Sequence, residues 1–194
     1  MTEQGTTSTA LRESITAGLR QAVKRRFGAA ADIDAVEFTS LGGSNRTVLF
    51  DLVDGTARRR LVFRQETIIP ANSPFLDPAR QFRVLSLLYP EGLPLPEPIF
   101  EFDDEDSLAR AYVVAFVEGE TVPRRLLDAP RYERARQRFC AQAGEFLGRL
   151  HALDPAPAAF LAEVPDSIDP LATTMARIDR WGGVHPALEL AARW

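Results

Sequence analysis

The chain has 194 residues, of which 45% are hydrophobic and 26% charged, and this is enough for one domain or two small lobes around a hydrophobic core. The net charge of −4 argues against non-specific nucleic-acid binding, which needs a basic face. A single cysteine, Cys140, excludes an intrachain disulfide, and with only two distant histidines it argues against a zinc site. No stretch approaches the length of a membrane span, and the polar residues 1–9 do not form a secretory signal, so we expect a cytoplasmic protein without a membrane partner.

The first predicted element is an amphipathic helix that follows a disordered tail, residues 1–10. Apolar residues recur at helical spacing and the pattern stops at a glycine: Leu11, Ile15, Leu19, Val23, Phe27 and then Gly28. The basic residues Lys24, Arg25 and Arg26 suit the negative end of the helix dipole, and we expect them to form a solvated face.

Three predicted strands follow, at residues 36–40, 47–53 and 61–64, joined by short polar turns that favour antiparallel pairing. The first turn contains Gly42 and Gly43, and the third strand ends on Arg64. Glycine allows positive φ, so the N–H groups of such a turn can converge on a phosphate, and the guanidinium adds charge. A plain hairpin turn has the same pattern, so both interpretations stay open at this point.

The rest of the chain predicts one more helix, two more strands and then only helices. Asp77 is a good N-cap and Pro78 fits the first turn of the helix at residues 78–89. Strands are predicted at 99–102 and 111–117, and helices at 122–127, 130–153, 171–181 and 186–194. The fold class is therefore α+β, with a five-stranded antiparallel sheet and one intervening helix in residues 11–118 and a helical part in residues 119–194. The acidic run around Gly119, at the boundary, is interpreted as a solvated turn.

This order of elements, with six short motifs in it, resembles the aminoglycoside phosphotransferase-like branch of the protein-kinase-like fold. More narrowly, the chain is similar to bacterial "phosphotransferase family" kinases, which are related to the kinase domain fused to some acyl-CoA dehydrogenases. The resemblance covers residues 11–154, and its motifs are Leu41-Gly42-Gly43-Ser44-Asn45-Arg46-Thr47, Leu61-Val62-Phe63-Arg64, Arg80-Gln81-Phe82-Arg83-Val84-Leu85, Leu93-Pro94-Leu95-Pro96, Phe116-Val117-Glu118-Gly119-Glu120 and Leu147-Gly148-Arg149-Leu150-His151-Ala152-Leu153-Asp154.

The resemblance implies a nucleotide site in the first lobe. The glycine turn would cover the ATP phosphates, Arg64 would contact them, apolar side chains would form a ceiling over adenine, and the linker backbone would pair with the adenine edge. The residues so implied are Leu41, Gly42, Gly43, Ser44, Asn45, Val48, Val62, Arg64, Gln81, Phe116, Val117 and Gly119.

Two departures from the family pattern matter. Such kinases pair the strand cation with a Glu on the next helix, but Gln81 stands there and residues 78–89 contain no acid. The His-Gly-Asp catalytic loop and the downstream Asn and Asp that bind Mg²⁺ are absent: His185 is followed by Pro186 and Ala187, and a structural role is expected for His151. We therefore expect no catalytic or metal-binding residues in this chain, as in a kinase cut off before its active site.

The function implied is ATP-dependent transfer of a phosphoryl group to a small hydroxyl compound, with Mg²⁺ bound outside these residues and the chain alone inactive. Aminoglycosides, macrolides, hydroxyacyl compounds, choline and sugars all stay open as acceptors. The alternative is a pseudokinase-like module that binds nucleotide or a protein without catalysis. Incomplete packing of the helical part would expose apolar residues and favour self-association, with these side chains as candidates: Phe139, Phe146, Leu150 and Trp181.

Overall fold

The computed structural model describes residues 3–39, 45–67, 76–163, 170–180 and 186–193. The chain divides into two compact units, Met1–Leu153 and Asp154–Trp194, and each is described by itself. The lobe boundary expected near Gly119 lies inside the first unit and stays a prediction.

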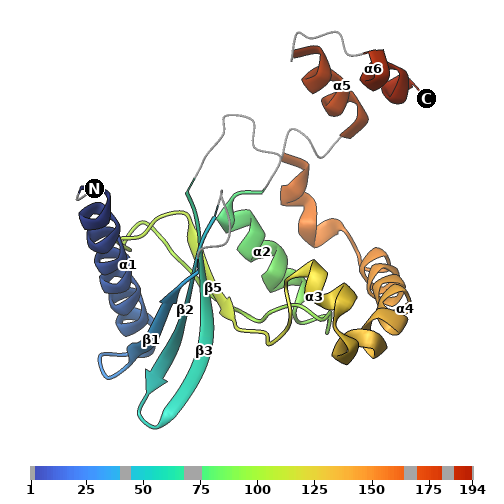
Figure 1. Ribbon diagram of the computed structural model, residues 1–194. Coiled ribbons are helices and arrows are strands. Elements are labelled where there is room, and N and C mark those ends of the chain that lie inside the picture. The colour runs from blue at the N-terminus through green and yellow to red at the C-terminus, as the bar shows by residue number, and fades with distance from the viewer. Residues whose placement is uncertain (1–2, 40–44, 68–75, 164–169, 181–185, 194) are drawn as a thin grey trace. The chain divides into compact units, whose positions relative to one another are not determined.

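The first unit is built on the five-stranded antiparallel sheet that the sequence predicts, with strand order β1-β2-β3-β5-β4 (Figure 1). The strands are β1 Asp32–Phe38, β2 Asn45–Asp54, β3 Ala57–Glu66, β4 Pro98–Glu101 and β5 Ala111–Ala115. Gly55, at φ +59°, makes the tight turn between β2 and β3, so Asp54 lies directly opposite Ala57. This turn sets the register of the whole hairpin.

The helices of the first unit are α1 Glu3–Phe27, α2 Pro78–Leu88, α3 Pro123–Asp128 and α4 Glu133–His151, with a 3₁₀ turn η1 at Pro130–Tyr132. The second unit contains η2 Ala156–Glu163, α5 Pro170–Arg180 and α6 Pro186–Arg193. The predicted order, one helix between strands three and four and only helices after strand five, is confirmed.

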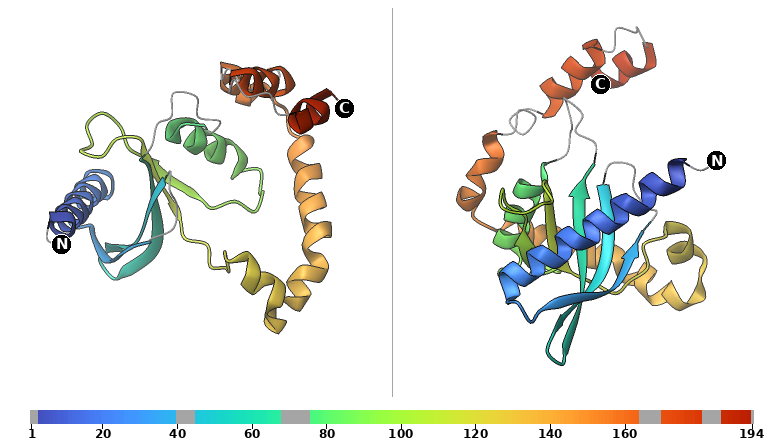
Figure 2. Two further views of the ribbon diagram at one scale, coloured as in Figure 1. Left: turned by 45° about the horizontal axis from the view of Figure 1, so that its top comes forward. Right: turned by 90° about the vertical axis from the view of Figure 1, so that its left-hand side faces the viewer.

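Helix α1 covers one face of the sheet, and α2 lies on the other face (Figure 2). The predicted apolar stripe supplies the contact, since Ile15, Leu19 and Val23 are no more than 2% exposed. The helix begins at Glu3, so the disordered tail expected at residues 1–10 is helical from its third residue. The sequence did not predict a helix over these residues because the prediction relied on apolar residues at helical spacing, and the first two turns of α1 contain no such stripe.

The basic end of α1 is an ion-pair cluster and not the solvated face that the sequence favoured. Arg26 donates to both carboxylate oxygens of Asp106, at 3.0 and 2.6 Å, and to the carbonyl of Glu101 at 2.7 Å. Arg25 reaches Asp103 at 2.5 Å. The Asp106 side chain is only 2% exposed. These bonds fasten α1 to the β4–β5 connection, which lies about 80 residues further along the chain and cannot be paired with α1 from local sequence.

Helix α2 begins as predicted. The carboxylate of Asp77 accepts a hydrogen bond from the backbone N–H of Arg80 at 3.0 Å, and Pro78 occupies the first turn. Burial acts to raise the pKa of Asp77, but the bonds from the Arg80 N–H and guanidinium outweigh it, so the pKa is lowered overall.

Helices α3 and α4 pack loosely within the first unit, and neither contains a buried residue. Phe139 is 68% exposed and Leu127 is 67% exposed, while Phe146 and Leu150 are partly exposed. The predicted exposure of these α4 side chains is thus confirmed, and Trp181 lies outside the described residues.

Candidate nucleotide-binding face

The candidate site lies on the face of the sheet opposite α1. Residues directly opposite each other in antiparallel strands point to the same face. Thr47 pairs with Arg64 and Leu49 with Val62 across the β2–β3 hairpin. On the other side of β3, Arg64 pairs with Tyr112 and Val62 with Val114, each across β5. The face therefore carries one apolar row, Leu49–Val62–Val114, beside one polar row, Thr47–Arg64–Tyr112.

The register corrects one predicted site residue. Val48 pairs with Phe63, and both are fully buried on the α1 side of the sheet. Val48 therefore cannot share a ceiling with Val62, because neighbouring residues of a strand point to opposite faces. Leu49 occupies the place assigned to Val48. Sequence reasoning missed it, although counting back from the Gly55 turn places Leu49 opposite Val62.

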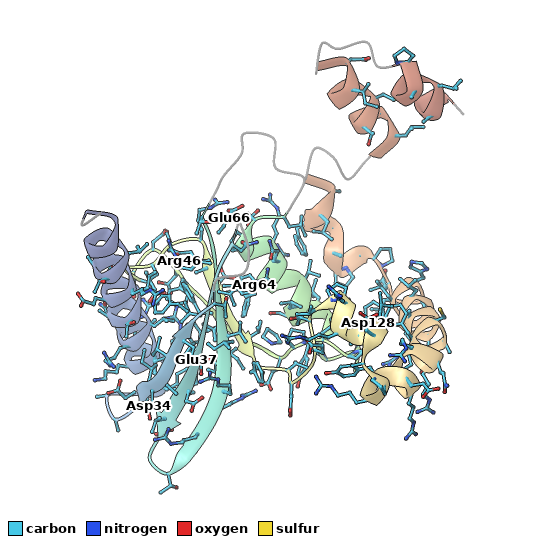
Figure 3. The ribbon with its side chains drawn as sticks, in the orientation of Figure 1. Asp34, Glu37, Arg46, Arg64, Glu66 and Asp128 are labelled. Atoms are coloured by element: carbon cyan, nitrogen blue, oxygen red, sulfur yellow. The ribbon has the colours of Figure 1, made fainter. Side chains whose placement is uncertain are left out.

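Arg64 is partly buried and forms no ion pair with any residue in the described part of the chain. Figure 3 shows it on the side of β3 that faces α2, with Glu66 near the end of the same strand. Glu66 is bound to Arg110 and so does not neutralise Arg64. In contrast, Arg60 on the same face is neutralised by Glu37 at 2.5 Å and Asp51 at 3.1 Å. The charge of Arg64 is therefore available to an anion.

Gln81 is linked to the polar row of the candidate face through Tyr112, and both ends of its side-chain amide are hydrogen-bonded. Its side-chain oxygen accepts a hydrogen bond from the Tyr112 hydroxyl at 3.0 Å, and its side-chain nitrogen donates to the carbonyl of Leu76. The sequence of α2 contains no acid, so no residue of that helix compensates the Arg64 charge.

Strand β5 ends at Ala115, two residues before the predicted end at residue 117. The segment that follows it is irregular. The N–H of Phe116 still donates to the carbonyl of Arg60 at 3.1 Å. Beyond it, the peptide groups of Val117 and Gly119 make no backbone hydrogen bond with a described residue. Unpaired peptide groups at the end of a strand can pair with the edge of a planar heterocycle.

The acidic run has a local structural role. Glu120 accepts a hydrogen bond from the N–H of Val122 at 3.1 Å and lies 3.6 Å from the guanidinium groups of Arg125 and Arg131. The bond from Val122 is the main reason that the pKa of Glu120 is lowered. Its side chain is 10% exposed, so the carboxylate is directed at its own segment and is not the solvated acid that the sequence favoured.

The described part of the chain also contains cavities and titratable side chains outside the two rows of this face. A cavity of about 360 Å³ lies between α3 and α4, and one of about 350 Å³ lies where the start of α2 meets the β4–β5 connection. Among the residues that the structure describes, no three His, Cys, Asp or Glu side chains are grouped so as to hold a metal ion. Within the same residues, no helix has both the length and the apolar character that crossing a bilayer requires.

Of the predicted site residues, the structure brings together Asn45, Val62 and Arg64 along the β2–β3 hairpin and Gln81 through Tyr112. Phe116, Val117 and Gly119 lie in the irregular segment that follows β5. Leu41, Gly42, Gly43 and Ser44 lie outside the described residues and stay a prediction.

One family comparison bears on identity. The sequence model of the phosphotransferase enzyme family matches residues 35–194, which is most of the chain and includes every strand residue of the candidate face. No curated protein matches the chain. The chain belongs to the phosphotransferase enzyme family.

Proposed function

We propose that the chain forms the ATP-binding part of a kinase that transfers the γ-phosphoryl group of ATP to the hydroxyl of a small molecule in the cytoplasm. The family supplies the reaction class. The observation that carries the ATP assignment is the Arg64 guanidinium, which has no acidic partner among the described residues. It lies next to an apolar row that leads to the peptide groups of Val117 and Gly119, for which no backbone hydrogen bond to a described residue is found.

The dimensions of the face suit an extended nucleoside triphosphate. Arg60 and Arg64 are four residues apart on β3, and the backbone carbonyl of Arg60 accepts the hydrogen bond from the N–H of Phe116. A strand rises about 3.3 Å per residue, so the linker and the Arg64 position are separated by about 13 Å. We propose that adenine lies against Leu49, Val62 and Val114 with its edge at the linker, and that the phosphates reach Arg64 and the predicted turn at residues 41–44.

The residues present fit binding better than catalysis. The sequence contains no His-Gly-Asp motif, and His151 is an exposed residue at the end of α4. Mg²⁺ would offset the charge of the triphosphate when bound with it, but the described residues offer no cluster of three metal ligands for it, and the Glu66 carboxylate on the strand of Arg64 is paired with Arg110. We therefore propose that these 194 residues bind Mg-ATP without transferring phosphate.

A second candidate is a non-catalytic, pseudokinase-like module that binds nucleotide or a protein partner. The engagement of Gln81 by Tyr112, together with the lack of any acid on α2, favours it over an ordinary kinase lobe. The two candidates differ in whether a longer chain with a catalytic loop transfers phosphate.

The test is a thermal and calorimetric titration with Mg-ATP on the wild-type chain, Arg64→Gln and a control, Arg124→Gln, whose side chain is 91% exposed on α3. Ligand at about 100 times Kd stabilises a protein by roughly 2.7 kcal/mol. We expect stabilisation of the wild-type chain and the control, and about 10- to 100-fold weaker binding by Arg64→Gln, since a charge-assisted bond is lost. No stabilisation at millimolar Mg-ATP would contradict ATP binding, and measurable phosphorylation of a hydroxyl compound would contradict inactivity.

We also propose that the chain self-associates through the exposed apolar side chains of α3 and α4. Leu127 and Phe139 border the cavity of about 360 Å³ between these helices. Sedimentation should show oligomers that dissociate in Phe139→Ser, and a monomer at high concentration would contradict this.

A further inference from the structure

Tyr112 is the buried residue next to the proposed phosphate contact. It lies directly opposite Arg64 across the β3–β5 pair, so both side chains leave the same face of the sheet. Its side chain belongs to a residue only 3% exposed, and its ring packs against Phe82 of α2 with ring centroids 6.2 Å apart. The ring of Tyr112 is therefore packed between the sheet and α2.

The hydroxyl of Tyr112 is held by a chain of hydrogen bonds. It donates to the side-chain oxygen of Gln81 at 3.0 Å, and the side-chain nitrogen of Gln81 donates to the carbonyl of Leu76. Both ends of the Gln81 amide are thus used, and the orientation of the amide is set because only its nitrogen can donate to a carbonyl. A carboxylate at position 81 could accept from Tyr112 but could not bind Leu76.

Tyr112 lies beside Arg64 on the same face of the sheet without cancelling its charge. Burial raises the pKa of the Tyr112 phenol, and the positive charge of Arg64 offsets only part of this. The phenol is therefore neutral at physiological pH and does not neutralise the Arg64 guanidinium, which has no acidic partner among the described residues.

We propose that Tyr112, anchored by Gln81, is a positioning residue that directs the Arg64 side chain at the phosphates of the nucleotide. This inference rests on the proposed ATP binding. It adds that the neutral, hydrogen-bonded pair Tyr112–Gln81 takes the place of an acid on α2. The site then favours the polyanionic part of the ligand, because the cation is both restrained and uncompensated.

The first test compares ATP with adenosine, which lacks phosphates, by NMR titration of the wild-type chain and of Tyr112→Phe. The variant keeps the ring and its packing but loses the bond to Gln81. We expect about 3- to 10-fold weaker ATP binding and unchanged adenosine binding, the scale of one hydrogen bond. Tyr89→Phe, at a tyrosine that is 39% exposed at the end of α2, is the matched control and should change neither. Equal weakening of both ligands would mean a structural role only, and would overturn the proposal.

The second test uses Gln81→Glu. We expect ATP binding to weaken by about 3- to 10-fold, because the carboxylate cannot donate to Leu76 and adds negative charge near the phosphates. Tighter ATP binding by Gln81→Glu would overturn the proposal, since it would show that an acid on α2 serves Arg64 better. In an Arg64→Gln background, Tyr112→Phe should have no further effect on ATP, as expected if it acts through Arg64.

These outcomes distinguish a chain that does not bind ATP from one that binds ATP without help from Tyr112. If the wild-type chain binds neither Mg-ATP nor inorganic tripolyphosphate, the proposed function fails and the positioning role fails with it. If the wild-type chain binds ATP and Tyr112→Phe leaves the ratio of ATP to adenosine affinity unchanged, the proposed function stands and only the role of Tyr112 is overturned.

Discussion

Gly18 offers a quantitative test of how closely α1 packs against the β4–β5 connection. It is a buried glycine in the middle of the helix, and a Cβ atom built there would lie 2.7 Å from Cγ of Leu108 and 2.7 Å from Oγ of Ser107. Ser107 can rotate its hydroxyl away. Leu108 is 7% exposed, and its branch point cannot move without displacing the neighbours that bury it.

Two opposing effects decide the outcome of Gly18→Ala. Alanine is favoured over glycine in a helix interior by about 1 kcal/mol. Forcing an extra methyl group into a close-packed contact costs about 1–3 kcal/mol. Since a distance of 2.7 Å to a carbon is far inside van der Waals contact, the packing cost should win, and we expect a net loss of about 1 kcal/mol in the free energy of unfolding.

Gly144→Ala in α4 is the matched control. It is a helical glycine whose Cβ would meet nothing within 4 Å, so only the propensity gain of up to about 1 kcal/mol applies. Urea denaturation followed by circular dichroism should give changes of opposite sign for the two variants. Stabilisation of similar size by Gly18→Ala would refute the tight packing of α1 against Leu108.

Three further predictions concern charge and backbone strain. Asp106→Asn should lower the free energy of unfolding by about 2–4 kcal/mol, because it leaves Arg26 without its buried partner, whereas Glu105→Gln, whose side chain is 83% exposed, should change it by less than about 1 kcal/mol in the same urea assay. Asp77 has a lowered pKa in the fold, so it contributes stability above the unfolded value near 4 and loses it as pH falls through the folded value; Asp77→Asn should therefore flatten the stability curve measured below pH 5, and an unchanged slope would contradict this. Ala35 has φ +47°, so Ala35→Gly should raise the melting temperature by about 2–4 °C, the effect of roughly 1 kcal/mol, and a lower melting temperature would contradict the strain argument.

Local patterns in the sequence predicted most of the fold. Short apolar runs between polar turns predicted all five strands, and the cap at Asp77 and Pro78 located the start of α2, because turn and capping signals act within a few residues. Arg64 lies on the third strand as predicted, although β3 continues past it to Glu66. Val48 was predicted to share a face with Val62, but Leu49, one position further along the chain, does so. Counting residue pairs back from the turn at Gly55 gives this register from the sequence.

The candidate site depends on contacts that no local pattern predicts. Tyr112 and Gln81 are 31 residues apart and meet only because β5 lies next to β3 while α2 lies on the same face. The basic end of α1 was expected in solvent for the same reason, since its acids lie about 80 residues away. Short-range propensity specifies which segments are strands and helices, but strand order and register decide which side chains share a face, and therefore whether the cation on β3 stands beside an acid or beside a neutral phenol.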